Sequence, residues 1–297
     1  MLKKVYLFLL FVLLVPSMTF VSGCALFPNR VTATSYYNPS WLPNGKIICT
    51  KFVNTYEQNL MWGGSKDISK DYYITTMNED GSGEQDVKNV TSINTYIVNG
   101  EIATSPDGAY IAVAANSKIE VFDSNFNHYK SISPSGYPEH LDFSPTSEGY
   151  KIVYTNSSNE LRLTDIDGSV DALITTEAEN VAWRVGEDII YEGLVDDIYI
   201  YLFYVNYNSK TSVQLSVSGL SPQKMLSDLI CYRGTGTSVQ KIYLNESNKV
   251  TLLDSYDQTS LRLSFDNTKI VGGELQQSDI NGVYVADIST GLTTQLR

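Results

Sequence analysis

The chain has 297 residues, of which 42% are hydrophobic and 18% charged, so it can bury a large core and general disorder is excluded. A formal net charge of −12 argues against nucleic acid as a partner, because phosphates are bound by basic surfaces. The 21 tyrosines favour β structure, and the two histidines, His128 and His140, leave little room for histidine-based catalysis or a histidine-rich metal site.

The first 24 residues have the organisation of a targeting segment. Lys3 and Lys4 precede an apolar run over residues 5–15, which is too short to span a bilayer as a helix and fits the core of a signal peptide. Small residues then lead directly to Cys24, an order that resembles the lipobox of bacterial lipoproteins. The resemblance implies cleavage between Gly23 and Cys24 and acyl chains on Cys24. An ordinary secretory signal with an incidental cysteine is the alternative.

This interpretation predicts residues 1–23 to be a signal peptide and residues 24–36 to be the lipidated cysteine and a short tether. Loss of Lys3 and Lys4 makes the mature chain still more acidic, so electrostatics would not hold it on an anionic membrane. The acyl chains would do so. We therefore expect a lipid-anchored, extracytoplasmic protein of the cell envelope, at the cell membrane or the outer membrane.

A short pattern, one polar or small residue followed by two apolar ones, recurs six times along the rest of the chain. Successive copies lie about 40 residues apart, except that the first interval is about 24 residues longer. The copies begin at Lys46, Tyr110, Lys151, Asp188, Asp228 and Lys269.

The surroundings of the pattern repeat as well. Turn sequences such as Pro43-Asn44-Gly45 and Pro106-Asp107-Gly108 precede it, and alternating segments follow it. The alternating segments are residues 73–77, 119–123, 161–165, 201–206, 242–245 and 283–287, and short final strands are predicted at 170–174, 213–217, 250–253 and 293–296. Each copy thus predicts four antiparallel strands. One such sheet cannot bury both faces, so six copies predict an all-β, six-bladed β-propeller over residues 37–297.

The repeat sequences also resemble a known family. Residues 38–47, 77–83 and 104–108 are similar to the repeats of TolB-type, WD-repeat-like propellers, and the resemblance extends over roughly residues 36–297. It implies the same six-bladed fold.

No sequence motif for catalysis was found: the chain contains no Gly-x-Ser-x-Gly elbow, no phosphate-binding loop and no His-Glu-x-x-His. His128 is expected in the loop after the third strand of copy two, and His140 just before the first strand of copy three. The acidic groups around Asp80 and Asp167 fit Asp-Gly turns better than calcium loops. We therefore expect no enzyme activity, no cofactor and no metal.

Two cysteines occupy the same position of the repeat. Cys49 and Cys231 both fall on a predicted second strand, in copies one and five. One blade would separate them, whereas a disulfide needs Cα atoms within about 7 Å. Both are predicted to be free and buried.

The additional residues of copy one, 52–70, are predicted to lengthen the hairpin between its second and third strands. Tyr56, Met61 and Trp62 in this segment, beside two glycines, indicate a partner-binding loop. The alternative is that they fold back on the blade as a small additional core.

These features together predict a non-catalytic, monomeric interaction module that binds an envelope protein or a glycan and contacts the membrane through its acyl chains. A carbohydrate-active lyase or hydrolase, or a lipoprotein that captures a glycan or small ligand, is the alternative. Paired acids inside the central funnel would favour a glycosidase, and acids that cap turns at the rim would favour the binding module.

Overall fold

The computed structural model describes residues 29–59, 64–92, 101–146, 149–183, 185–195, 199–225, 229–234, 238–253, 261–273 and 283–296. These residues contain 24 β-strands and no helix. Accordingly, no helix suited to crossing a membrane occurs in this described part of the chain.

The strands form six four-stranded sheets, each built from consecutive strands in chain order, and we number these sheets as blades one to six. Blade one comprises β1 (Asn29–Trp41), β2 (Ile47–Asn59), β3 (Gly64–Met77) and β4 (Gln85–Asn89). Blade two comprises β5 (Ile102–Thr104), β6 (Tyr110–Ala115), β7 (Lys118–Asp123) and β8 (His128–Ile132). Blade three comprises β9 (Pro138–Phe143), β10 (Lys151–Asn156), β11 (Glu160–Asp165) and β12 (Asp171–Thr176). Blade four comprises β13 (Ala178–Ala182), β14 (Asp188–Val195), β15 (Tyr199–Asn206) and β16 (Ser212–Gln214). Blade five comprises β17 (Leu220–Lys224), β18 (Leu229–Arg233), β19 (Val239–Tyr243) and β20 (Val250–Leu253). Blade six comprises β21 (Arg262–Leu263), β22 (Lys269–Gly273), β23 (Val283–Asp287) and β24 (Thr293–Gln295).

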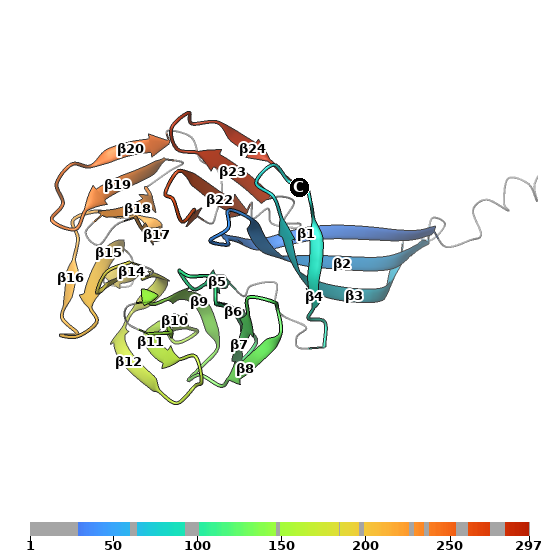
Figure 1. Cartoon of the computed structure of the whole chain (residues 1–297), viewed down its shortest axis with the longest axis horizontal. Helices are drawn as coiled ribbons and strands as arrows, with labels where there is room; N and C mark the ends of the chain where they lie inside the picture. The colour runs from blue at the N-terminus through green and yellow to red at the C-terminus, as the bar shows by residue number, and fades with distance from the viewer. Residues whose placement is uncertain are drawn as a thin grey trace, which may run out of the picture. The chain divides into compact units, whose positions relative to one another are not determined.

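The fold is therefore the predicted six-bladed β-propeller of antiparallel blades. In blades two to five, the first strands lie towards a common centre and the fourth strands β8, β12, β16 and β20 lie at the periphery (Figure 1). Burial follows this order: β5 is buried throughout, whereas every residue of β16 is exposed. The inner strands carry the apolar repeat positions because neighbouring blades cover them.

Six hydrophobic clusters fill the spaces between adjacent blades of the described chain. The cluster between blades three and four, for example, packs Val153 and Leu161 against Val181 and Trp183. The cluster between blades six and one includes Trp41, Ile47 and Val285. Since each blade consists of consecutive strands, the ring closes by this side-chain packing and not by exchange of a strand.

Local sequence signals placed most strands correctly. At the predicted turns, Gly45 and Gly108 have φ values of +81° and +72°, and their amides donate to Leu42 O (3.0 Å) and Ser105 O (2.8 Å). The six second strands lie where the repeated pattern predicts them. Some later strands differ from prediction: β19 begins three residues early, at Val239, β16 ends at Gln214, and β12 extends to Thr176.

The described residues separate into two compact units. Residues 29–34, 53–59 and 64–71, the hairpin unit, form one, and residues 35–52 together with the described residues from Tyr72 onward, the propeller unit, form the other. β2 and β3 continue into the hairpin unit, so the prediction of a lengthened hairpin is confirmed. The predicted tether needs correction, because β1 begins at Asn29, inside residues 24–36. Three of the four residues in the run Val31-Thr32-Ala33-Thr34 are β-branched, and such residues favour a strand over an irregular tether.

The cysteine prediction is confirmed. Cys49 lies on β2 and Cys231 on β18, and both are free and fully buried. Burial raises the pKa of Cys231 to about 12 and also raises that of Cys49. Both therefore serve as small core residues.

Candidate functional site

The predicted site residues fall mainly outside the described part of the chain. Gly23 and Cys24, and also Met61 and Trp62, lie outside it. Tyr56 is described: it lies on β2 within the hairpin unit and is partly exposed.

The hairpin unit is held together by polar contacts between its strand segments. The hydroxyl groups of Thr32 and Thr55 lie 3.4 Å apart, joining β1 to β2. Asn54 Nδ2 donates to Asp67 Oδ1 at 3.4 Å, joining β2 to β3. None of the described side chains of this unit is buried. Its described residues thus lack a hydrophobic core of their own.

A nearly buried group of charged residues in the propeller unit joins three blades. Glu101, directly before β5 of blade two, forms an ion pair with Arg262 on β21 of blade six. Its Oε1 lies 3.0 Å from His140 Nδ1 on β9 of blade three, and its Oε2 accepts the amide of Leu141 at 3.2 Å. The side chains of Glu101 and Arg262 are only 14% and 10% exposed.

Charge complementarity dominates the electrostatics of this trio. Burial raises the pKa of Glu101, but Arg262 and His140 outweigh it and lower that pKa to about 2. Burial likewise lowers the pKa of His140, but the Glu101 carboxylate outweighs it, and the net direction is upward. The trio is thus arranged to hold the carboxylate ionised.

Further hydrogen bonds connect neighbouring blades near this trio. Trp41 Nε1 of blade one donates to Arg262 O of blade six at 3.1 Å. Asp142 Oδ2 of blade three accepts the Trp183 amide of blade four at 2.8 Å. Glu192 on β14 of blade four accepts the Ser221 amide of blade five. Burial raises the pKa of Glu192 to about 7.

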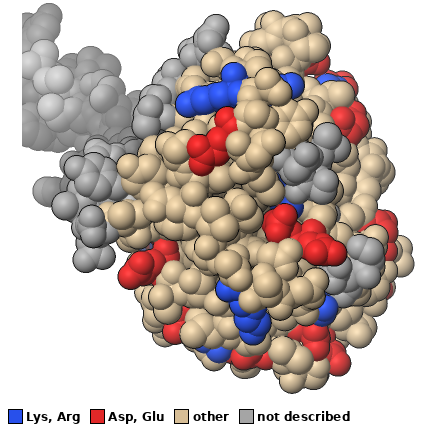
Figure 2. Space-filling view, turned by 90° about the vertical axis from the view of Figure 1, so that its left-hand side faces the viewer, with Lys and Arg blue, Asp and Glu red and all other residues tan. Residues whose placement is uncertain are grey.

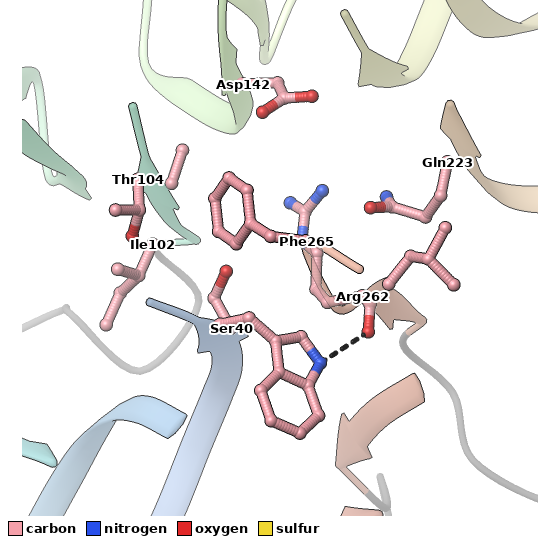
Figure 3. A pocket seen from close by; sticks show the side chains of 10 residues that line it. Ser40, Ile102, Thr104, Asp142, Gln223, Arg262 and Phe265 are labelled. Atoms are coloured by element: carbon pink, nitrogen blue, oxygen red, sulfur yellow. Dashed lines mark hydrogen bonds between the residues drawn. The ribbon is translucent and has the colours of Figure 1, made fainter. Parts of the chain in front are cut away.

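The space between the inner strands is narrow where these groups meet. Figure 3 shows labelled side chains from β1, β5, β9, β17 and β21 converging on it, and its dashed line marks the hydrogen bond that Arg262 O accepts from Trp41. The cavity has a volume of about 10 Å³, which accommodates a single water-sized group. Thr104 Oγ1, which lines it, is buried and has no hydrogen-bond partner among the described residues. A sugar does not fit at this point.

Many aspartates outside the centre cap turns. Each of them accepts a hydrogen bond from the amide two residues further on, the geometry of an Asx turn. They are Asp80, Asp107, Asp123, Asp167, Asp266 and Asp287. Hydrogen bonds from Ser289 and Thr290 lower the pKa of Asp287 to about 2. The sequence interpretation of Asp80 and Asp167 as turn residues is confirmed.

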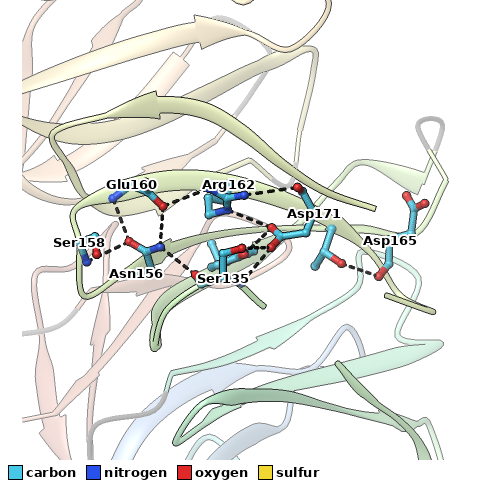
Figure 4. Close-up of polar contacts among 9 residues, drawn as sticks. Ser135, Asn156, Ser158, Glu160, Arg162, Asp165 and Asp171 are labelled. Carbon is cyan, nitrogen blue, oxygen red and sulfur yellow. Dashed lines mark hydrogen bonds and ion pairs between the residues drawn. The ribbon is translucent and has the colours of Figure 1, made fainter. Parts of the chain in front are cut away.

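A second polar network lies in blade three (Figure 4). Asp171 Oδ1 accepts from Tyr154 Oη at 2.6 Å and from Arg162 Nε at 3.0 Å. Arg162 also pairs with Glu160 at 3.1 Å, and Asp171 Oδ2 accepts from Ser135 Oγ at 2.6 Å. These groups satisfy one another, so the network fixes the blade edge.

The positions predicted for both histidines were wrong. His140 lies inside β9, where its ring reaches Glu101, and His128 begins β8. Sequence reasoning also missed Glu101, Arg262 and Glu192. A signal existed for two of them: Arg262 stands between Leu261 and Leu263, and Glu192 follows an apolar run. A charge within a buried strand indicates a fixed partner.

Comparisons with known proteins bear on the fold. No protein-family model and no curated protein matches the chain. A protein assigned as TolB from Agrobacterium tumefaciens shares 14% identity at a TM-score of 0.52, over 66% of this chain and 79% of its own. The WD40 domain of Neurospora crassa Pan2 shares 10% sequence identity at a TM-score of 0.53, and the match covers 81% of this chain and 86% of that domain. An oligogalacturonate lyase from Vibrio parahaemolyticus shares 9% sequence identity at a TM-score of 0.47, and the match covers 87% of this chain and 91% of the lyase. The chain therefore has a TolB-like, WD40-like propeller fold, and this fold does not select one function.

Proposed function

We propose that this protein is a lipid-anchored interaction module of the cell envelope, with Cys24 as the anchored residue and the hairpin unit as the surface that binds a partner protein. The proposed location is the extracytoplasmic face of the cell membrane or the outer membrane.

The observation that carries this proposal is the exposure of the hairpin unit. A small sheet without a covered face is only marginally stable in water. Here none of the described side chains of residues 29–34, 53–58 and 64–71 is buried, although Val31, Val53, Tyr56 and Ile68 offer apolar surface. A partner that covers one face would stabilise the unit and bury these side chains.

The distribution of charge supports binding over catalysis. The aspartates that cap turns are engaged with backbone amides, which is the arrangement expected of an interaction module. Lys, Arg, Asp and Glu side chains form small separate groups on the face shown in Figure 2, with broad uncharged surface between them. This face belongs to the propeller unit, and its charges are not concentrated in one patch.

Two experiments test the proposal. Mass spectrometry of the mature N-terminus should find diacyl or triacyl modification on Cys24, and a Cys24→Ser variant should leave the membrane fraction; unmodified wild-type protein would contradict the anchor. Replacement of both Tyr56 and Trp62 by alanine should abolish crosslinking to the partner while Tm stays unchanged. Loss of Tm instead would assign these residues to a core.

One observation favours a second candidate, a carbohydrate-active lyase or hydrolase. The pKa values of Glu101 and Glu192 are separated, at about 2 and about 7, as in enzymes that use one carboxylate as base and another as acid. The cavity of about 10 Å³ nearby opposes it. Turnover of a polysaccharide that disappears in Glu192→Gln would establish this candidate in place of the interaction module.

A further inference from the structure

An open pocket at the outer part of blade two is distinct from both the hairpin unit and the central trio. Its volume is about 420 Å³, within the range of small-molecule sites. Its lining includes Asn116, Ser117, Lys118, Glu120, His128 and Ser131. The β6–β7 turn provides one wall, and side chains of β7 and β8 provide another. We call this space the blade-two pocket.

A buried carboxylate lies at the base of the pocket. Glu120 is only 4% exposed and stands on β7 between Ile119 and Val121, which are fully buried. Its Oε2 accepts from Ser131 Oγ at 2.6 Å and lies 2.9 Å from His128 Nε2. Both interactions end at Oε2, and no hydrogen bond or ion pair among the described residues uses Oε1. One carboxylate oxygen therefore remains for a ligand.

The propeller repeat does not require this carboxylate. The corresponding positions of β11 and β23 hold Arg162 and Tyr284, neither of which is buried. In blade three, Arg162 is satisfied by Glu160 and Asp171 (Figure 4). Burial of a charge is unfavourable unless hydrogen bonds compensate it. Glu120 is thus a local feature of the blade-two pocket.

The geometry indicates binding and not hydrolysis. In a Ser–His–acid relay, the histidine stands between the other two groups and uses one ring nitrogen for each. Here Ser131 donates directly to Glu120, and the same nitrogen of His128, Nε2, lies near both Ser131 Oγ (3.1 Å) and Glu120. This arrangement fixes the carboxylate and does not activate the serine.

The chemistry of the lining defines the class of ligand. The lining supplies the Glu120 carboxylate, the His128 ring and one ammonium, that of Lys118, and its other polar groups are three serine hydroxyls and the Asn116 amide. A sugar hydroxyl can donate to a carboxylate and accept from an ammonium or amide at the same time. We propose that the blade-two pocket binds a neutral, hydroxyl-rich saccharide unit, with Glu120 Oε1 and Lys118 as its principal contacts.

Saturation-transfer NMR tests this proposal on the full chain in a detergent without a sugar head group. The probes are N-acetyl-D-glucosamine and D-galactose, with glycine as a zwitterion of matched polarity. Transfer to at least one sugar is expected, and about tenfold weaker binding in Glu120→Gln and in Lys118→Ala. Lys130→Ala provides the matched control, because Lys130 is an exposed lysine of β8 outside the lining.

Three outcomes would overturn the proposal: no transfer to either sugar, transfer to glycine in place of the sugars, or equal weakening by Lys130→Ala and Lys118→Ala. Since Glu120 is buried, Glu120→Gln is first compared with wild type in urea unfolding. If it is unfolded, the exposed Lys118→Ala variant decides the result alone.

Discussion

Replacement of Glu101 by glutamine tests whether the central trio holds blades two, three and six together. The substitution keeps the shape of the side chain but removes the carboxylate that pairs with both the nearly buried Arg262 and His140. A pKa lowered from 4.5 to about 2 corresponds to about 3 kcal/mol of folding free energy. Breaking a buried ion pair from one side has a similar cost, about 3–5 kcal/mol.

The pH dependence gives this prediction its sign. Because the folded pKa of Glu101 lies below its unfolded value, the stabilisation is complete above pH 4.5 and is lost as the pH falls towards 2. Urea unfolding at pH 7 should therefore show Glu101→Gln less stable than wild type by about 3 kcal/mol, and the difference should shrink towards zero near pH 2.

Glu79→Gln is the control for this experiment. Glu79 also pairs across blades, with Lys269, but its side chain is 53% exposed, so its loss should change stability by at most about 1 kcal/mol. Equal stability of Glu101→Gln and wild type at pH 7, or a difference that persists unchanged at pH 2, would refute the reasoning.

Three further predictions concern the propeller unit. Trp183→Ala should lower the free energy of unfolding by about 3–5 kcal/mol in urea, because the ring is fully buried between blades three and four; a loss below about 1 kcal/mol would contradict that packing. Thiol titration should find Cys49 and Cys231 unreactive in the native protein and both reactive in guanidinium, and rapid native labelling would show that they are not core residues. Burial raises the pKa of Glu192 to about 7, so the stability that its protonated form provides is present below pH 4.5 and is lost as the pH rises through 7. The free energy of unfolding of Glu192→Gln should therefore gain about 2 kcal/mol on that of wild type between pH 5 and 8. Parallel stability curves for the two proteins would contradict this assignment.

The propeller was predictable because its signals are local. Blades one and two carry the turns Pro43-Asn44-Gly45 and Pro106-Asp107-Gly108, in which Asn44 and Asp107 cap the turn and the glycine takes a positive φ, and an apolar strand follows each turn. The cysteine positions followed from the same repeat, since Cys49 and Cys231 share one column. These features need only a few neighbouring residues to be specified.

The central trio was not predictable, because its members are distant in sequence. Glu101 and Arg262 are 161 residues apart, and only the closed ring brings them together. His140 was misplaced for a related reason: the sequence before Phe143 has no strong apolar alternation, and its strand is fixed by pairing of β9 with β10. Likewise, the strand that begins at Asn29 depends on its partner β2.

The central claim, that the hairpin unit binds a partner at the membrane, is tested most directly by site-specific photocrosslinking in intact producing cells. A photoreactive residue replaces Tyr56 in one variant and Tyr129, a 48% exposed tyrosine of β8, in a matched variant. One discrete adduct of defined mass is expected from position 56 and none from position 129. No adduct from position 56, or the same adducts from both positions, would contradict it.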